Sequence, residues 1–408
     1  MTSAADTKTT ELAGAPRPSA PLRLLSLGLV AAGVLLSLPA LFSDGGRAQF
    51  AHGYLMGFTF VWGIALGSLF WVVLHHLTHA RWSVVVRRVM EMLAEPVWLA
   101  GLFFIPLALM VVLNARFHLY EWADPGIVAG DALLQGKRPY LNTPFFILRG
   151  LVFFGLWIGF ARFFVRGSLS QDNGGAGAGA TLRMRSLSPA FMLVFAVTVT
   201  FAGIDWLMSL SPRWFSTIFG VYVFGGIILT SLAAVTVATV GLLRTGRISA
   251  RAVTPDHLYN LGAFLFAFTI FWAYIAFSQY MLIWYGNMPE ESFYMVRRLE
   301  DGWLKISLAL AAMRLFIPFF VLLSRRAKRN ATVLFWVSLL ILAGQLLDLY
   351  WLIMPEALPG GPTFGWRGVG PVLLMAGAYV WCVSRFLGRH APLAKGDPEL
   401  AESLRFHL

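Results

Sequence analysis

The stretch FAGIDWLMSLSPRWFSTIFGVYVFGG, Phe201–Gly226, consists of two apolar runs joined by a short polar corner, and it carries a carboxylate, Asp205, inside the first run. Two such runs predict a hairpin of membrane-spanning helices. An ionised side chain at membrane depth is costly, so an acid there indicates an ion path, a proton relay or a paired structural charge. The remainder of the chain should therefore supply a partner for Asp205.

The composition indicates an integral membrane protein. Of the 408 residues, 58% are hydrophobic and only 13% are charged, and the mean hydropathy is +0.70. The predicted fold is all-α and polytopic, with about ten spans of roughly 20 to 25 residues each. The net charge of +12 does not indicate a nucleic-acid partner, because the Lys and Arg residues lie between apolar runs and not on one solvated face.

The single cysteine limits the redox chemistry that the chain can carry. Cys382 lies inside the last apolar run. One cysteine cannot form an intrachain disulfide, a CxxCH haem attachment or an iron–sulfur ligand set. We therefore expect no covalent cofactor, and any redox centre should belong to a partner or be bound non-covalently.

The apolar runs divide the chain into six segments: a flexible cytoplasmic tail at 1–20, a first span at 21–49, a four-helix unit of spans two to five at 50–216, a second unit of spans six to nine at 217–355, a tenth span at 356–390 and a cytoplasmic tail at 391–408. Between spans two and three, Ala80–Glu95 mixes charges with apolar residues, which predicts an amphipathic interfacial helix. The glycine-rich run at 172–180 predicts a disordered, dispensable linker, with span five beginning at Pro189.

The distribution of basic residues predicts the orientation. With the N-terminal side taken as cytoplasmic, 21 Lys and Arg residues lie in loops and tails on that side and 9 on the other. Cytoplasmic loops carry the excess of positive charge in membrane proteins. Both termini are therefore expected in the cytoplasm, and an even number of spans agrees with this.

Charged residues inside the spans suggest a weak internal repeat. Asp205 on span five and Asp348 on span nine both lie about 10 Å from the outer end of their helix, at 1.5 Å per residue. The span before each of them carries an arginine, Arg149 or Arg314. The pattern predicts two similar four-helix units in which Arg149 pairs with Asp205 and Arg314 pairs with Asp348.

Hydroxyl groups extend this pattern into a hypothesis about protons. Thr198, Asp205 and Ser209 share one helix face, and Tyr274, Ser278 and Tyr285 share a face of span seven. Such rows could carry protons from the outer acids towards the cytoplasm. The alternatives are that the charges are structural ion pairs and that the hydroxyls only serve helix packing.

Histidines at the predicted inner rim raise the question of a haem. A transmembrane b-type haem needs two axial histidines at one depth, and His75 or His76 ends span two while His257 opens span seven. The depth fits, but a rim position does not provide the burial that a haem requires. The simpler interpretation is that these histidines lie at loop edges near basic residues. The run HHLTH also lacks the acid of the HExxH zinc motif.

Four runs resemble a known family: WSVVVRRVMEML at Trp82–Leu93, YLNTPFFILRG at Tyr140–Gly150, DWLMSLSPRWFSTIFGVYVF at Asp205–Phe224 and FAFTIFWAYIAFSQYMLIWYGNMPEE at Phe266–Glu291. They are similar to the smaller NrfD-like (polysulfide-reductase-like) membrane subunit of bacterial alternative complex III. The resemblance extends from about Leu22 to Leu387.

The resemblance implies an inner-membrane subunit of a quinol:cytochrome c oxidoreductase with two four-helix bundles and extra flanking helices. It implies a larger NrfD-like membrane subunit as a partner, together with periplasmic subunits that carry the haem c and iron–sulfur clusters. Quinol would bind at this subunit or at the larger one, which is the better candidate for quinol oxidation. This chain would then be a structural or proton-conducting subunit without its own redox centre. The residues that the motifs carry over are Asp205, Arg149, His257, Gln279, Tyr280 and Tyr285.

Two other functions fit the same pattern. Paired bundles with charges inside the membrane also describe secondary transporters, although the repeat is not clearly inverted and no glycine-broken helices face each other. A purely structural scaffold would need buried charges only to fix its packing.

Overall fold

The computed structural model describes residues 14, 19–43, 45–172, 174, 177–363 and 365–408. It is 81% helical, and its described part contains no strand. Ten helical segments are long and apolar enough to span a membrane: α2 (Ala20–Phe42), α3 (Gly46–Leu77), η1 to α5 (Arg81–Val112), α9 (Thr143–Asp172), α10 with η3 (Gly177–Leu210), α11 (Phe219–Arg244), α12 (Pro255–Gly286), α14 to α15 (Trp303–Leu323), α17 (Ala331–Ala357) and α18 (Trp366–Arg389). The prediction of an all-α polytopic membrane protein is therefore confirmed.

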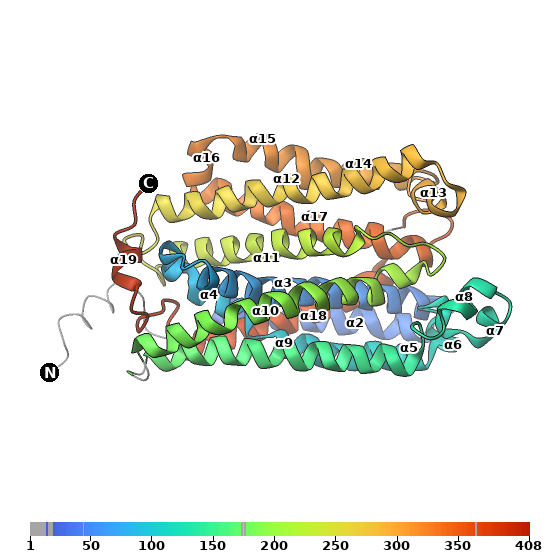
Figure 1. Ribbon diagram of the computed structural model, residues 1–408, viewed down its shortest axis with the longest axis horizontal. Helices are drawn as coiled ribbons and strands as arrows, with labels where there is room; N and C mark the ends of the chain where they lie inside the picture. The colour runs from blue at the N-terminus through green and yellow to red at the C-terminus, as the bar shows by residue number, and fades with distance from the viewer. Residues whose placement is uncertain (1–13, 15–18, 44, 173, 175–176, 364) are drawn as a thin grey trace.

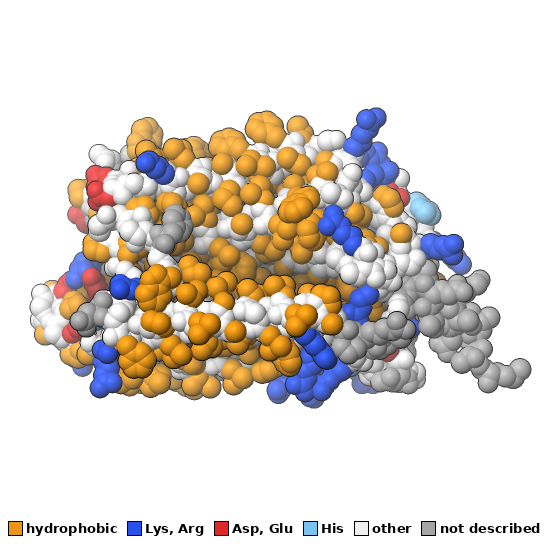
Figure 2. All heavy atoms as spheres, turned by 180° about the vertical axis from the view of Figure 1, so that it is seen from behind, with side chains coloured by type: hydrophobic (Ala, Val, Ile, Leu, Met, Phe, Trp, Pro, Cys, Tyr) orange, Lys and Arg blue, Asp and Glu red, His pale blue; other side chains and the backbone are white. Residues whose placement is uncertain are grey.

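The long helices run side by side along the length of the molecule (Figure 1). We call the two ends of this bundle the tail end, which carries α19 (Leu400–Leu404), and the loop end, which carries α13 (Pro289–Val296). Hydrophobic side chains cover the middle of the face in Figure 2, and Lys and Arg side chains gather towards its two ends. This apolar belt is what a protein that crosses a membrane several times requires.

Short helices connect the long ones at the two ends. The connection from α5 to α9 contains α6 (Asn114–Phe117), η2 (Glu121–Ala123), α7 (Pro125–Ala129) and α8 (Ala132–Lys137). Asp124 and Asp131 each accept hydrogen bonds from backbone N–H groups at the start of α7 and α8, as N-cap residues do. Helix α13 likewise follows α12, and α16 (Arg325–Arg329) joins α15 to α17.

The spans pack as two rings of four helices. In the first ring, α3, α5, α9 and α10 each pack against the next. Its interior is aromatic: the ring centroids of Trp62 and Trp206 are 5.0 Å apart, and those of Trp62 and Trp157 are 5.6 Å apart. In the second ring, α11 packs between α12 and α17, and the α14 to α15 segment closes the ring.

Helix α3 joins the two rings because it packs against α11 and α17 as well as against its own ring. Gly67 permits this approach, since a Cβ there would lie 2.4 Å from the Ser231 hydroxyl. The flanking helices α2 and α18 pack tightly against each other, and α18 also packs along α3. The site residues therefore lie on helices that are fixed on several sides.

At the tail end, the prediction of an interfacial helix at Ala80–Glu95 is wrong. All eleven residues of α4 (Val84–Ala94) are buried, including Arg87, Arg88 and Glu91. The charges are tolerated there because they have partners: Arg87 forms an ion pair with Asp397, and Arg88 bonds to Asp172 at 2.8 Å. The sequence showed the amphipathic pattern, but not the distant acids that allow its polar face to be buried.

The glycine-rich linker was also predicted incorrectly. Helix α9 continues to Asp172 and α10 begins at Gly177, so Pro189 lies inside α10 and not at its start. Residues 173, 175 and 176 lie outside the described residues. Asp172 is not dispensable, because it accepts hydrogen bonds from Arg88 and from the backbone N–H of Gly396.

The C-terminal segment, predicted only as a tail at 391–408, is folded against the tail end. Leu393, Ala394 and Leu400 are buried. Ser403 accepts a hydrogen bond from the backbone N–H of Val85, and its backbone oxygen lies 3.0 Å from His257 Nε2. Of the tail predicted at the other terminus, residues 1–13 and 15–18 lie outside the described residues.

The contact between α2 and α18 gives a first prediction. A Cβ at Gly33 would lie 2.4 Å from the Leu374 backbone nitrogen, whereas nothing lies within 4 Å of a Cβ at Gly28 on the same helix. Gly33→Leu should therefore force the helices apart, at a cost of about 1–3 kcal/mol. We expect a lower melting temperature in mild detergent for Gly33→Leu, with Gly28→Leu unchanged. Equal melting temperatures for the two variants would contradict the close packing.

Candidate functional site

The first buried charge centre joins α9 to α10. Arg149 donates to Asp205 through both Nε, at 2.7 Å, and Nη2, at 3.0 Å. Tyr140, just before α9, donates its hydroxyl to Asp205 Oδ1 at 2.8 Å, and its ring lies 4.0 Å below the Arg149 guanidinium. Asp205 is 1% exposed. The predicted pairing of Arg149 with Asp205 is therefore present as a two-bond contact, which is the strongest arrangement of these groups.

Tyr140 lies outside the spans and is a fixed proton donor. Burial raises the pKa of its hydroxyl above the ordinary value, and the negative charge of Asp205 raises it further. A raised pKa means that the hydroxyl keeps its proton throughout the physiological range. Both oxygens of Asp205 are thus bonded to donors that do not lose their protons near neutral pH.

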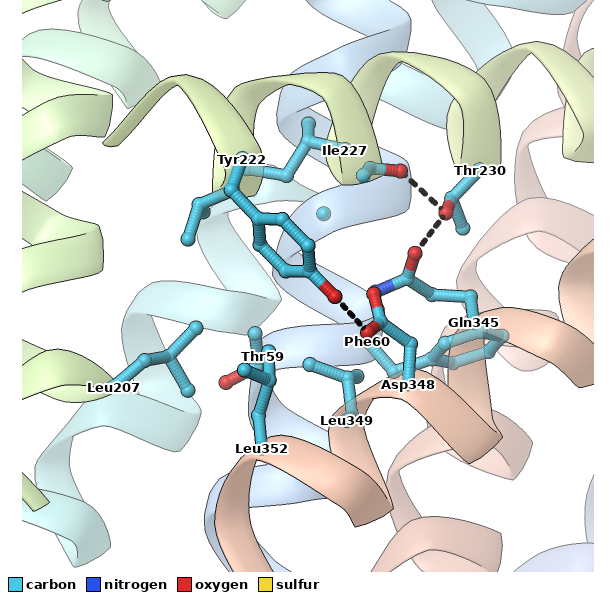
Figure 3. Close-up of a pocket in the computed structure, with 13 residues that line it drawn as sticks. Thr59, Phe60, Leu207, Tyr222, Ile227, Thr230, Gln345, Asp348, Leu349 and Leu352 are labelled. Carbon is cyan, nitrogen blue, oxygen red and sulfur yellow. Dashed lines mark hydrogen bonds between the residues drawn. The ribbon is translucent and has the colours of Figure 1, made fainter. Parts of the chain in front are cut away.

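The second centre joins α17 to α11 and to the α14 to α15 segment. Arg314 donates through Nη1 to Asp348 Oδ2 at 2.9 Å and also to the amide oxygen of Gln345. The Tyr222 hydroxyl donates to Asp348 Oδ1, and Thr230 donates to Gln345 at 2.8 Å (Figure 3). Arg314 is 0% and Asp348 1% exposed. The second predicted pair is also in contact, and both acids have one arginine and one tyrosine as partners.

Local irregularities make room for Arg314. The residue lies in a π-helical turn, Ala312–Phe316, between α14 and α15. Such turns insert one extra residue into a helix and are frequent at functional sites. Gly344 on α17 faces the arginine, since a Cβ there would lie 2.8 Å from Arg314 Cγ. The backbone of both helices is thus adapted to hold a long cation at this depth.

Two cavities meet at Tyr222. One, of about 20 Å³, lies between the rings and is bordered by Tyr222, Asp348 and Gln345 (Figure 3). Its volume is enough for about one water molecule. The other, of about 450 Å³, lies inside the second ring towards the loop end and is also lined by Tyr222. Tyr222 therefore separates a large cavity from the Asp348 carboxylate.

The large cavity is mostly apolar, with a few polar groups on its wall. Gln279 and Trp272 line it, and their side-chain atoms Oε1 and Nε1 are buried and have no hydrogen-bond partner among the described residues. One is an acceptor and the other a donor. Ser307 is a third polar group and accepts a hydrogen bond from Trp351 Nε1 at 2.8 Å. An apolar pocket with a few placed polar groups is the usual form of a small-molecule site.

Arg298, between α13 and α14, brings a positive charge to the same cavity. It is 1% exposed and donates to the backbone oxygens of Tyr294, Trp351 and Leu352 at 2.9 to 3.2 Å. Burial lowers the pKa of this guanidinium, because it has only neutral carbonyl partners within bonding distance. Burial also raises the pKa of Tyr294, whose ring lies 3.5 Å from it, to about 12.

The two centres differ in how completely their groups are bonded. In the first, Arg149 uses Nε, Nη1 and Nη2, the last two towards Tyr140 and Asp205. In the second, Nε and Nη2 of Arg314 have no partner among the described residues. A buried guanidinium that lacks partners is costly and favours a bound water or a change in its bonding. The second centre therefore has buried donors on Arg314 without partners among the described residues, whereas the donors of Arg149 are bonded.

The predicted hydroxyl rows have different outcomes. Thr198 accepts a hydrogen bond from Trp157 Nε1 at 2.8 Å and donates to Val194 O, which is a packing role. On α12, Tyr274 and Tyr285 are 65% and 83% exposed, and Ser278 is half-buried. The predicted row on α12 therefore faces outward and cannot form an internal proton path in this chain. The spacing of Tyr274, Ser278 and Tyr285 predicts that they share one face of α12, but it does not show whether that face points into the bundle or outward.

The opposite face of α12 supplies the cavity residues instead. Gln279 is buried and Tyr280 is 36% exposed, and both line the 450 Å³ cavity. The sequence analysis did not assign a role to Tyr222 or Arg298. Tyr222, Gly226 and Thr230 recur every four residues and so share one face of α11, which is a signal that could have identified Tyr222.

The rim histidines are buried, contrary to the loop-edge interpretation. His75, His76 and His257 are 2%, 1% and 0% exposed, because α4 and the C-terminal segment cover the tail end. His257 caps α12 with Thr254 and reaches Ser403 O, so both of its ring nitrogens have protein partners. Among the described residues, no three His, Cys, Asp or Glu side chains come together as a metal site would.

No family model matches the chain, and a search of curated proteins finds no significant match.

The first centre provides a stability test. Asp205→Ala leaves the buried Arg149 without its acid and should cost about 3–5 kcal/mol, whereas replacing both charges by apolar residues is often nearly neutral. We expect Asp205→Ala to lower the melting temperature strongly, and Arg149→Met combined with Asp205→Leu to recover most of the loss. A double variant as unstable as the single one would show that the pair is not an isolated structural unit.

Proposed function

We propose that this chain is an integral membrane subunit of a quinol-oxidising complex of the alternative complex III type. The proposal rests on the resemblance of four sequence runs and, in the structure, on one observation. A 450 Å³ cavity of mainly apolar wall is separated by one tyrosine from a buried, incompletely bonded Arg–Asp pair. In this proposal the cavity takes a quinol head group, and Asp348 receives a proton from it.

The wall chemistry suits a quinol head group. A quinol is a flat ring with two hydroxyl groups, and the cavity is lined by the indole of Trp272 and by Gln279, whose buried Oε1 has no partner among the described residues. In this proposal the Gln279 amide turns towards the cavity, so that a quinol hydroxyl can donate to its oxygen. The nearby Arg298 guanidinium would stabilise the negative charge that develops on a quinol oxygen as its proton leaves.

The proton step can be written for one hydroxyl group. Tyr222 passes its proton to Asp348 and takes one from the quinol, so the tyrosine is restored and the acid becomes neutral. The other hydroxyl group releases the second proton to water at the mouth of the cavity, and the two electrons of the quinol go to haem c or iron–sulfur groups, which the proposal places on periplasmic partner subunits. The chain itself then handles protons and positions the ring, and it carries no redox centre.

The first centre supports a second, structural role for the same subunit. Both oxygens of Asp205 and three nitrogens of Arg149 are bonded to fixed protein groups. These hydrogen bonds hold α9, α10 and the Tyr140 segment together. They leave no oxygen of Asp205 without a donor, so this acid is not placed to exchange protons. We therefore assign Arg149 and Asp205 to the scaffold of the proposed complex.

Purification would test the complex itself. The chain, tagged at its C-terminus and extracted from its native membranes in mild detergent, should retain haem c and iron–sulfur polypeptides and show haem bands in a reduced-minus-oxidised spectrum. A colourless chain that purifies alone would contradict the proposal and favour the secondary transporter.

Variants at the second centre would test the proton step. In the purified complex, Asp348→Asn and Tyr222→Phe should each lower quinol oxidation by about 100-fold, because a positioned acid–base group contributes roughly that factor or more. Tyr379→Phe is the matched control, since Tyr379 is also buried and bonded, to Leu93 O at the tail end. Full activity in Tyr222→Phe and Asp348→Asn, with normal assembly, would exclude this proton path.

A further inference from the structure

A basic hollow at the tail end lies outside the site described above. It has a volume of about 310 Å³ and lies where the start of α5, the end of α9 and the end of α18 meet. Arg162 and Arg166 from α9, with His390 after α18, form its polar wall. Trp98, Ile158 and Phe386 form its apolar wall. Charged and apolar surfaces thus meet in one hollow.

The hollow has an excess of positive charge. Arg162, Arg385 and Arg389 are all near enough to Glu95 to interact with its carboxylate electrostatically, and Glu95 is the one acid on the wall. Among the described residues, none of the three arginines lies within 4.0 Å of a carboxylate oxygen, nor does Arg166. Two arginines of the wall, Arg162 and Arg166, therefore share a single acid with Arg385 and Arg389, which lie outside the wall.

Some other arginines at the tail end have acids as partners. Arg87, Arg88, Arg185 and Arg329 each bond to a carboxylate at 2.8 Å or less. Those side chains meet acids from the C-terminal segment, from α9 or from α12. The arginines at the hollow meet none at that distance, so an external anion would complete their bonding.

The surface below the hollow faces the lipid. On α5, Leu102 and Ile105 are 51% and 59% exposed, and with Trp98 they share one helix face. On α9, Gly155 and Gly159 precede Arg162, and nothing lies within 4 Å of a Cβ at either glycine. The hollow therefore opens above a lipid-facing surface that is indented along α9. In Figure 2 a group of Lys and Arg side chains lies beside the hydrophobic belt near this end.

We infer that the hollow binds the phosphate head group of an anionic phospholipid, with its acyl chains along α5 and α9. A lipid is favoured over a soluble anion because the arginines continue directly into an apolar, lipid-facing surface with a tryptophan at the boundary. It is favoured over an acidic protein segment because the hollow is only about 310 Å³ and lies beside the helices that face the membrane. The inference does not depend on the proposed quinol function.

The test compares variants in detergent micelles containing either phosphatidylcholine or phosphatidylglycerol. Phosphatidylglycerol should raise the melting temperature of the unmodified protein and remain bound in native mass spectrometry. Each arginine near a lipid surface contributes about a fivefold change in affinity, so Arg162→Gln with Arg166→Gln should weaken phosphatidylglycerol binding about 30-fold. Glu95→Gln should strengthen it, because it removes a repulsive charge; a merely structural Glu95 would not have this effect.

The matched control is Arg325→Gln with Arg326→Gln. These two arginines are also exposed and near the tail end, but they line none of the hollows described above. Their replacement changes the net charge equally and should leave phosphatidylglycerol binding unchanged. If both double variants lost phosphatidylglycerol binding equally, the effect would come from general surface charge, and the inference would be overturned.

Three other outcomes would also overturn it. Inorganic phosphate that protects the protein as well as the lipid does would indicate a soluble anion site. Loss of a partner polypeptide, and not of lipid, in the Arg162 and Arg166 double variant would identify a protein interface. Unchanged lipid binding in a double variant that melts normally in phosphatidylcholine would show that the hollow does not bind lipid.

Discussion

Charged side chains buried inside this helical bundle need polar or oppositely charged partners within the protein, and that constraint explains much of the architecture. A cation or a carboxylate buried alone costs several kcal/mol, so the helices that carry such groups must be neighbours in a fixed register. The pairs Arg149–Asp205 and Arg314–Asp348 fix α9 against α10 and the π-helical turn against α17. At the tail end the same requirement draws in the C-terminal segment, whose Asp397 meets the buried Arg87.

The pairings could be predicted because they follow from a simple rule applied to few residues. Only Arg149 and Arg314 are basic residues inside predicted spans, and Asp205 and Asp348 lie on the next helix at similar depth. The spans themselves were predictable from hydropathy alone. The polar neighbours were not: Tyr222 is one hydroxyl among many in apolar helices, and no local pattern distinguishes it as the donor to Asp348.

Other features depend on contacts between distant residues, and the sequence could not supply them. Burial of α4 requires Asp172 and Asp397, which lie about 80 and 300 residues further along the chain. Tyr274 and Tyr285 point outward because another face of α12 packs against α11. The spacing of residues along a helix shows which of them share a face, but not which face meets a neighbouring helix. The π-helical turn at Ala312–Phe316 is followed by Pro318, which removes a backbone donor and so indicates an irregularity, but the proline does not specify a π-helical turn.

The two centres share an arginine, an acid and a tyrosine, yet the source of the tyrosine makes them different. Tyr140 comes from the segment before α9 and closes the first centre from the loop end, where Nε, Nη1 and Nη2 of Arg149 are also all bonded. Tyr222 comes from α11, a helix of the second ring that packs against α3, and it lines two cavities. A tyrosine in the first position strengthens an ion pair, whereas one in the second position also connects it to a space that can hold a ligand. The same three side chains can therefore serve as a structural clamp in one ring and as a proton-exchanging group in the other, with the difference set by which helix supplies the hydroxyl.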